Sequence, residues 1–221
     1  MPKLSTNSAI MMQKNPNSPS AEAYRSLRFN IDCSVFGREA KVVTITSSSR
    51  GEGKTTTAIN LAVAYAQTGK KVILVDADLR NPSIHLSFGG DNGSGLTNYL
   101  AQQNTLNEIV RQSMIENLSI LTSGPIPQNP SGLLASSQMD VLLAELRANY
   151  DMVIVDTTSI LTLTDAKIMA TKCDGTLLIV KFGKLKRGIA KKVKEELHLA
   201  KVNLIGVVMN EMKNEHAASY L

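Results

Sequence analysis

The sequence has no tryptophan, few aromatic residues and only two cysteines. Aromatic residues make up 4% of its 221 residues, which disfavours the aromatic surfaces on which RNA-recognition and single-strand-binding folds stack bases. Cys33 and Cys173 have neither CxxC nor metal-ligand spacing, so we expect no disulfide framework and no structural zinc. Unpaired thiols are typical of a reducing compartment, and the sequence therefore predicts a cytoplasmic protein.

Long apolar stretches are also absent. No uncharged apolar run approaches the ~18 residues that a transmembrane helix needs. Residues 1–20 contain no apolar segment followed by a small-residue cleavage site, as a secretory signal would. With 43% apolar and 19% charged residues, the chain has enough apolar surface to build a core.

Short apolar runs alternate with helical segments over most of the chain. The runs that predict strands lie at 41–46, 71–78, 118–124, 152–156, 176–182 and 204–210. The segments that predict helices lie at 19–31, 55–69, 95–112, 133–149, 165–173 and 185–201. This alternation predicts a doubly wound α/β fold, with a mainly parallel sheet and helices on both faces.

Three parts of different character are predicted along the chain. Residues 1–18 carry Pro16 and several Asn and Ser without periodicity, which predicts a flexible arm. Residues 19–213 form one domain, and 214–221 form a short tail. In the first predicted helix, Ala23, Leu27 and Ile31 lie four residues apart and predict a single apolar stripe.

The clearest motif is SSRGEGKT, between the first predicted strand and the helix that follows it. Glycines let such a loop turn its backbone amides towards phosphate oxygens, while a Lys and a hydroxyl at its end serve the phosphates and Mg²⁺. The consensus glycine at the first position is replaced by Ser48, so the match is a variant. The alternative is a strand-to-helix turn that binds nothing. The predicted nucleotide-binding residues of the loop are Ser49, Arg50, Gly51, Glu52, Gly53, Lys54, Thr55 and Thr56.

Acidic residues stand where two apolar strands end. Asp76 and Asp78 close ILVDAD, and Asp156 closes VIVD. Ligands of open α/β sheets bind at this edge, and neighbouring carboxylates repel each other unless a cation intervenes. The sequence therefore predicts that Lys54 and Mg²⁺ lie among these groups. The alternative for Asp76 and Asp78 is that they cap a helix and form a surface ion pair with Arg80. The alternative for Asp156 is that it caps the turn after its strand.

Taken together, these segments resemble the bacterial tyrosine kinases, a family within the MinD/ParA branch of P-loop proteins. The resemblance covers residues 19–213 and includes ExxRxxR at 22–28, GPIPQNPS at 124–131 and LIGVVMN at 204–210. Within this family, the sequence most resembles the free-standing kinases of capsule and exopolysaccharide operons. It implies ATP and Mg²⁺ as cofactors, and a tyrosine kinase that autophosphorylates in trans and regulates the synthesis of these polysaccharides.

The resemblance also implies roles for single residues. Lys54 and Thr55 would bind phosphates and Mg²⁺, Asp76 would be the candidate general base, and Asp78 would be a catalytic metal-shell ligand. Asp156 would reach Mg²⁺ through water, and Asn210 would lie near the adenine. The family usually has two prolines after the last of these aspartates. Here the sequence reads DTTS, which we expect to loosen that loop.

Further partners follow from the same resemblance. Glu22, Arg25 and Arg28 would join subunits into a ring, although these side chains also suit ion pairs within one helix. The cytoplasmic tail of a membrane chain-length regulator would activate the kinase and recruit it to the inner face of the membrane. A cognate tyrosine phosphatase would reverse the reaction. Tyr220 is the single tyrosine of the tail and the predicted phosphoacceptor.

Two other functions remain open at this stage. A MinD/ParA-like partitioning ATPase would carry a lysine where Ser49 stands. An ATP-binding protein without phosphotransfer would explain the short tail. A basic segment at 181–201 suits an anionic membrane or an acidic activator, as well as a solvated helix face. Nucleic-acid binding has no support from groove-reading or aromatic residues.

Overall fold

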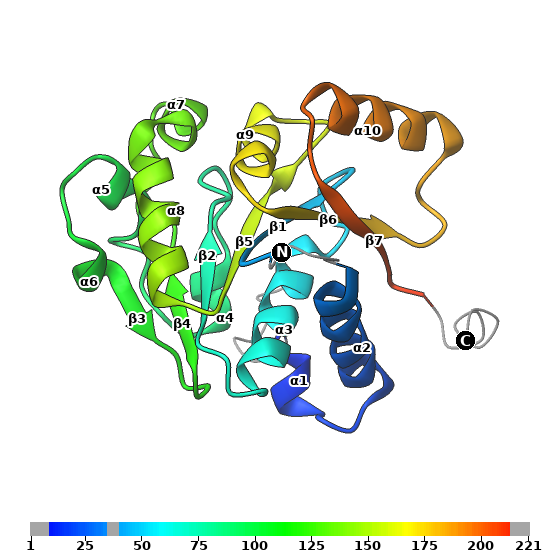
Figure 1. Cartoon of the computed structure of the whole chain (residues 1–221), viewed down its shortest axis with the longest axis horizontal. Coiled ribbons are helices and arrows are strands. Elements are labelled where there is room, and N and C mark those ends of the chain that lie inside the picture. Colours follow the sequence, from blue (N-terminus) through cyan, green and yellow to red (C-terminus); the bar gives the residue numbers. More distant parts are fainter. Residues whose placement is uncertain (1–8, 35–39, 213–221) are drawn as a thin grey trace.

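The described residues of the chain form a seven-stranded sheet covered by helices on both faces (Figure 1). The computed structural model describes residues 9–34 and 40–212. The strands are β1 (Val42–Ser47), β2 (Val72–Asp76), β3 (Val110–Gln112), β4 (Leu118–Leu121), β5 (Met152–Ser159), β6 (Gly175–Lys181) and β7 (Leu204–Asn210). The helices are α1 (Met11–Lys14), α2 (Pro19–Ser34), α3 (Lys54–Ala66), α4 (Ile84–Ser87), α5 (Leu96–Leu100), α6 (Leu106–Ile109), α7 (Pro130–Ala135), α8 (Ser137–Asn149), α9 (Thr164–Lys172) and α10 (Arg187–Leu199). No helix in the described part is long and apolar enough to cross a membrane.

The sheet has the order β3-β4-β2-β5-β1-β6-β7, and β3 alone runs antiparallel to its neighbour. All residues of β1 and β5 are buried, because helices cover both faces of these central strands. The first apolar cluster joins α1–α4 to one face of the sheet, and two further clusters join α5–α10 to the other. The predicted doubly wound α/β fold is confirmed.

The placement of the first helices differs from the prediction. Ile10 and Met12 are buried in the core against α3, so residues 10–14 are not part of a flexible arm. Asn60 of α3 holds this segment: it accepts the Met12 amide at 3.0 Å and donates to the Ala9 carbonyl at 2.7 Å. A segment with two apolar anchors is too short to show periodicity, and its partner lies 48 residues away.

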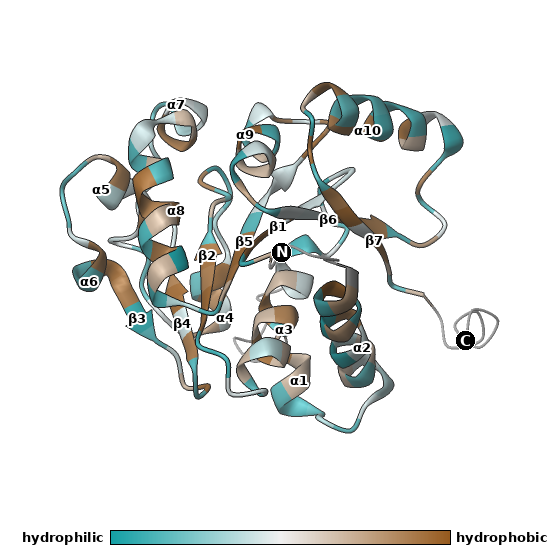
Figure 2. Cartoon of the chain, viewed as in Figure 1, coloured by the Kyte–Doolittle hydropathy of each residue, from teal (hydrophilic) through white to brown (hydrophobic). Residues whose placement is uncertain are grey.

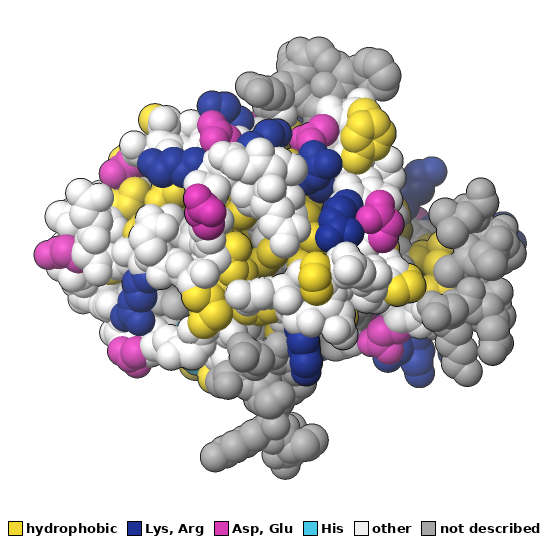
Figure 3. Space-filling view, turned by 90° about the horizontal axis from the view of Figure 1, so that it is seen from below, with side chains coloured by type: hydrophobic (Ala, Val, Ile, Leu, Met, Phe, Trp, Pro, Cys, Tyr) yellow, Lys and Arg dark blue, Asp and Glu magenta, His cyan; other side chains and the backbone are white. Residues whose placement is uncertain are grey.

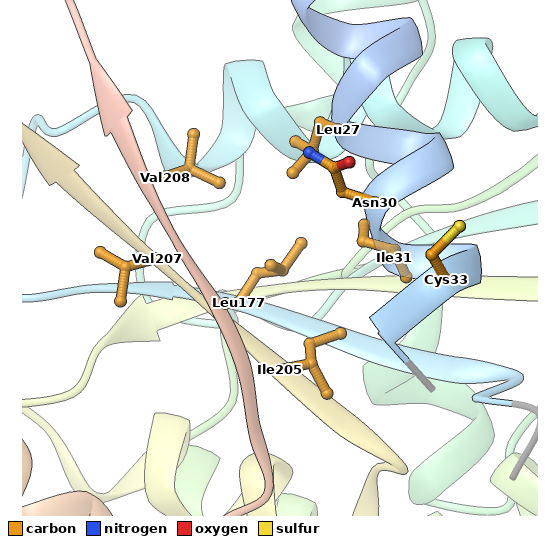
Figure 4. Close-up of a pocket in the computed structure, with 9 residues that line it drawn as sticks. Leu27, Asn30, Ile31, Cys33, Leu177, Ile205, Val207 and Val208 are labelled. Atoms are coloured by element: carbon orange, nitrogen blue, oxygen red, sulfur yellow. The ribbon is translucent and has the colours of Figure 1, made fainter. Parts of the chain in front are cut away.

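The apolar stripe of α2 also differs. Ala21, Tyr24 and Ile31 are buried, whereas Ala23 is exposed, so the face that packs is turned from the predicted one. Between α2 and β7 lies a mainly apolar groove of about 430 Å³ (Figure 4). Its lining residues are Leu27, Asn30, Ile31, Cys33, Leu177, Ile205, Gly206, Val207 and Val208. None of them belongs to the predicted nucleotide site.

Strand β5 continues through the DTTS run, which the sequence predicted to be a loosened loop. Thr157 and Thr158 are buried, and hydroxyls on both strands tie β5 to β1. Thr157 Oγ1 donates to the Ile45 carbonyl at 2.8 Å, and Thr46 Oγ1 donates to the Thr158 carbonyl at 2.7 Å. The expected loosening was wrong, because β-branched threonines extend the strand that prolines would end.

Candidate active site

The predicted phosphate loop connects β1 to α3 at the carboxyl edge of the sheet. Its glycines take the left-handed backbone that the turn requires, with φ of 82° at Gly51 and 88° at Gly53. A Cβ on Gly53 would lie 2.0 Å from Asn210 Nδ2, so a side chain has no room there. Helix α3 begins at Lys54, and its amides and positive dipole end face the loop, as an anion site requires.

Asn210, at the end of β7, braces this loop from outside. Its Nδ2 donates to the Glu52 carbonyl at 2.9 Å, and its Oδ1 accepts the Glu211 amide. The structure thus places Asn210 against the phosphate loop. Its predicted position beside the adenine stays a prediction.

The Glu52 side chain braces the loop from inside, which the sequence did not reveal. Its carboxylate is nearly buried and accepts hydrogen bonds from Ser48 Oγ at 2.8 and 2.9 Å and from the Ser49 amide at 2.9 Å. Ser48 is the residue that replaces the consensus glycine. The serine that replaces the consensus glycine therefore supplies a second donor, besides the Ser49 amide, to a nearly buried carboxylate.

This pairing leads to a prediction. Glu52→Ala should lower the free energy of unfolding by about 1–3 kcal/mol, since it leaves the Ser48 hydroxyl and the Ser49 amide without a partner. It should also weaken ATP binding, because the loop loses its fixed shape. Thermal unfolding and calorimetric ATP titration measure both, with exposed Glu116→Ala as the matched control. Equal behaviour of the two variants would show that the brace is unimportant.

The three predicted aspartates meet beside Lys54 and Thr55. Asp76 and Asp156 are paired in the register of β2 and β5, so the two strands end at the same level. Lys54 Nζ lies 3.4 Å from Asp78 Oδ2, and Thr55 Oγ1 donates to Asp156 Oδ2 at 2.6 Å. The structure therefore brings together all the residues predicted to serve phosphate and metal.

Burial dominates the electrostatics of this cluster. It raises the pKa of Asp156 to about 8, and the nearby Asp76 carboxylate adds to this effect. Burial also raises the pKa of Asp76 to about 6, against the lowering effect of the Ile84 and Ser83 amides. Two buried carboxylates at the ends of neighbouring strands repel each other and are not both ionised without a cation. The cluster is thus arranged for positive charge beyond that of Lys54.

The residues present fit Mg²⁺. Asp156 Oδ1 is buried and has no hydrogen-bond partner among the described residues, so it is an acceptor aimed into the site. The Thr55 hydroxyl is beside it. Oxygen donors of this kind suit Mg²⁺, which commonly binds one or two protein oxygens together with water and phosphate. No group of three or more His, Cys, Asp or Glu side chains in the described part is arranged around one metal position.

The two carboxylates after β2 differ in what they contact. Asp76 Oδ2 accepts the Ser83 and Ile84 amides at 3.0 Å each, so Asp76 caps the start of α4. Its Oδ1 accepts one longer bond, of 3.2 Å, from the Asp78 amide and keeps a lone pair for a proton. The cap that the sequence left as an alternative is present, yet one oxygen of Asp76 remains available.

Arg80 is paired with Asp165, and not with Asp76 or Asp78 as the alternative from the sequence supposed. Its guanidinium donates to both oxygens of the buried Asp165, at 2.7 and 3.2 Å, and to Ser131 Oγ at 3.1 Å. Ser131 Oγ in turn donates to Asp165 at 2.6 Å. These contacts join α7 and α9 to the loop after β2. They hold in place the segment that carries Asp78, and only the fold brings the three residues together.

A cleft of about 260 Å³ opens beside the phosphate loop. It is lined by Ser48, Ser49, Arg50, Gly51, Glu52, Lys181, Lys184 and Ile189. Lys181 is paired with Glu211. The cleft is therefore bounded by loop backbone on one side and by cationic side chains on the other, a surface that suits a polyphosphate. Thr56 lies in the first turn of α3, where its carbonyl accepts from Asn60.

The predicted subunit contacts and the phosphoacceptor are placed as follows. Arg25 pairs with Glu22 at 3.0 Å and donates to the Pro16 carbonyl at 2.7 Å, while Arg28 pairs with Asp32 at 3.1 Å. Both arginines are thus engaged within their own chain. Tyr220 lies outside the described residues.

Fold and site together define a P-loop nucleotide-binding protein, with a phosphate loop after the central strand β1 and carboxylates where β5, its neighbour, and β2, the next strand in the sheet, end. Known proteins agree. Residues 40–191 match the family described as AAA domain. The tyrosine-protein kinase YwqD of Bacillus subtilis is 44% identical over 98% of this chain and 94% of its own length. The chimerical protein CapA2B2 has a TM-score of 0.90 at 37% identity, over 94% of this chain and 91% of that one.

The chain belongs to the family of bacterial tyrosine-protein kinases. The resemblance noted from the motifs is thereby confirmed. The cell-division ATPase MinD of Pyrococcus furiosus, at a TM-score of 0.66 and 23% identity over 82% of this chain and 79% of that one, shares the fold alone.

Proposed function

We propose that this chain transfers the γ-phosphoryl group of ATP to tyrosine hydroxyls of proteins, with Mg²⁺ as cofactor. The observation that carries the proposal is the convergence of Lys54, Thr55 and three strand-end aspartates beneath a preformed phosphate loop. Phosphoryl transfer needs mainly positioning and charge neutralisation, which such a site supplies. Bound Mg²⁺ would neutralise phosphate charge and polarise the transferred group.

Each residue then has a defined task. The backbone of residues 49–53 and the start of α3 bind phosphate oxygens, and Lys54 leaves Asp78 to place its charge on them. Thr55 and Asp156 hold the metal side of the site, with Asp78 in its outer shell. Asp76 accepts the proton of the tyrosine hydroxyl at Oδ1, where a pKa raised to about 6 suits a base at neutral pH. We place the adenine near Asn210.

Incubation of the purified protein with ATP and Mg²⁺, followed by detection of phosphotyrosine, tests this function. We expect a signal that depends on Mg²⁺ and lies on Tyr220 of a neighbouring subunit, read by mass spectrometry of the tail peptide. The same assay with an activator tail peptide covers the case in which ATP binding needs that partner. Nucleotide binding without phosphotyrosine in either assay would favour the binding-only alternative.

The biological setting is part of the proposal and rests on the family resemblance. The kinase would act in the cytoplasm, at the inner face of the membrane, with the tail of a chain-length regulator as activator. A tyrosine phosphatase would return it to the unphosphorylated ring. Its output would be the control of capsular or exopolysaccharide synthesis.

The helix α2 gives a prediction about the ring. Replacing Arg25 and Arg28 together by Ala should move the size-exclusion peak towards the monomer, because bidentate guanidinium pairs suit contacts between subunits. The fold should be retained, since exposed pairs of this kind contribute only a few tenths of a kcal/mol. The control is Lys191→Ala with Lys192→Ala on α10, across the sheet. An unchanged oligomer at equal concentration would remove the motif from the interface.

A further inference from the structure

Helix α10 and the segments beside it carry a strongly basic surface that, apart from Lys184, lies outside the cleft beside the phosphate loop. Its members, which we call the basic face, are all exposed: Lys184, Lys186, Arg187, Lys191, Lys192, Lys194 and Lys201. Among the described residues, the ion pairs of this face consist of one exposed contact of 3.8 Å between Lys191 and Glu195. Most of these cations are thus not neutralised by acidic groups in the described part of the chain.

The charge of the whole protein is concentrated here. Residues 181–201 hold eight Lys and Arg against two Glu, a net charge of +6, whereas the complete chain has +5. The rest of the molecule is therefore close to neutral. On the side away from α10, basic and acidic side chains alternate over the surface (Figure 3). A neutral body with one basic face meets an anionic partner in a fixed orientation.

Apolar side chains lie uncovered next to this helix. Val207 and Met209 of the edge strand β7 are paired in register with Leu178 and Val180 of β6. These two β6 residues pack under α10, so Val207 and Met209 point to the same side of the sheet. They are 53% and 45% exposed. Figure 2 shows the hydrophilic outer turns of α10 and the hydrophobic stretch of β7.

We propose that the basic face and the outer side of β7 dock directly on an anionic lipid bilayer. Lipid headgroups supply the negative charge, and the boundary with the acyl chains accepts apolar side chains. The cations of the basic face would contact the headgroups, while Val207 and Met209 would reach the boundary with the acyl chains. An acidic peptide would match the charge but would leave Val207 and Met209 in water. Four of the cations, Arg187, Lys191, Lys192 and Lys194, lie on the exposed side of α10 and not in a groove that would hold a peptide. This docking does not depend on the kinase activity.

Vesicle co-sedimentation tests the proposal with the full chain. We expect binding to phosphatidylcholine vesicles containing about 30% phosphatidylglycerol at physiological salt, weakening steeply as salt is raised, and at least about tenfold weaker binding to phosphatidylcholine alone. Absence of binding to the anionic vesicles would overturn the proposal. Binding to a polyglutamate peptide but not to vesicles would assign the face to an acidic protein partner and would also overturn it.

Charge reversal locates the contact. Lys192→Glu with Lys194→Glu should weaken binding to anionic vesicles by about tenfold or more, because two contacts become repulsive. The control, Lys14→Glu with Lys71→Glu, makes the same change of net charge on exposed residues outside the basic face and should have little effect. Equal losses in both variants would mean that net charge alone acts, which contradicts the proposal. Val207→Ser should weaken binding without changing its salt dependence.

Discussion

Lys54→Met should lower the rate of tyrosine phosphorylation by at least about 100-fold while the fold is kept. The lysine lies at the start of α3, is 12% exposed and reaches the acid cluster through Asp78. Methionine is also unbranched and only one atom shorter, but it has no charge for the phosphates. Loss of one preorganised electrostatic contact commonly costs this much in rate. Phosphotyrosine formation measured over time gives the rate, and circular dichroism reports the fold.

The matched control is Lys70→Met, an exposed lysine on the loop that follows α3. It should leave the rate within about twofold of the original, as surface changes away from a site commonly do. A Lys54→Met protein that keeps more than a tenth of the activity would exclude this lysine from phosphoryl transfer.

Asp156→Asn should abolish most activity and yet stabilise the protein in the absence of Mg²⁺. The carboxylate is fully buried next to Asp76, and one of its oxygens has no partner among the described residues. An amide removes the charge and keeps an oxygen that accepts the Thr55 hydroxyl. We expect about 1–2 kcal/mol of stabilisation, or a rise of roughly 2–8 °C in Tm, since active sites retain groups that the fold alone disfavours.

The pH dependence provides an independent readout of the same group. Burial raises the pKa of Asp156 in the folded state from 3.8 to about 8. Between these values the folded protein binds a proton that the unfolded chain releases, so stability falls as the pH rises through this window. Asp156→Asn should flatten this slope in Mg²⁺-free thermal unfolding at pH 5 to 8. An unchanged slope, or a lower Tm at pH 7.5, would contradict the assignment.

The sequence predicted the main elements of the site because they depend on local chain geometry. A glycine-rich turn between a buried strand and a helix positions Lys54 and Thr55, and parallel strands that end in aspartates bring Asp76 and Asp156 to one edge. The alternation of apolar runs sufficed for the doubly wound sheet. The short strand β3 was missed inside a predicted helical segment, since three residues carry no periodicity.

What the sequence could not predict depends on side chains that meet only in the fold. Glu52 lies in a loop, and nothing in the sequence pattern indicates that its carboxylate turns inwards to Ser48. Arg80, Ser131 and Asp165 are far apart along the chain and form one hydrogen-bonded group. Burial of the polar Asn60, which secures Ala9 and Met12, could not be inferred from an otherwise apolar helix.

That single amide has a mechanical consequence. The Asn60 side chain is hydrogen-bonded to the backbone of Ala9 and Met12 and also to the Thr56 carbonyl, in the first turn of the phosphate-binding helix. A pulling force applied at Ala9 would thus be transmitted to the first turn of the helix that begins at Lys54. Affinity tags and reporter domains on this kinase are therefore better attached at sites other than the segment before Ala9. Asn60→Leu would remove the hydrogen bonds that connect this segment to the phosphate-binding helix.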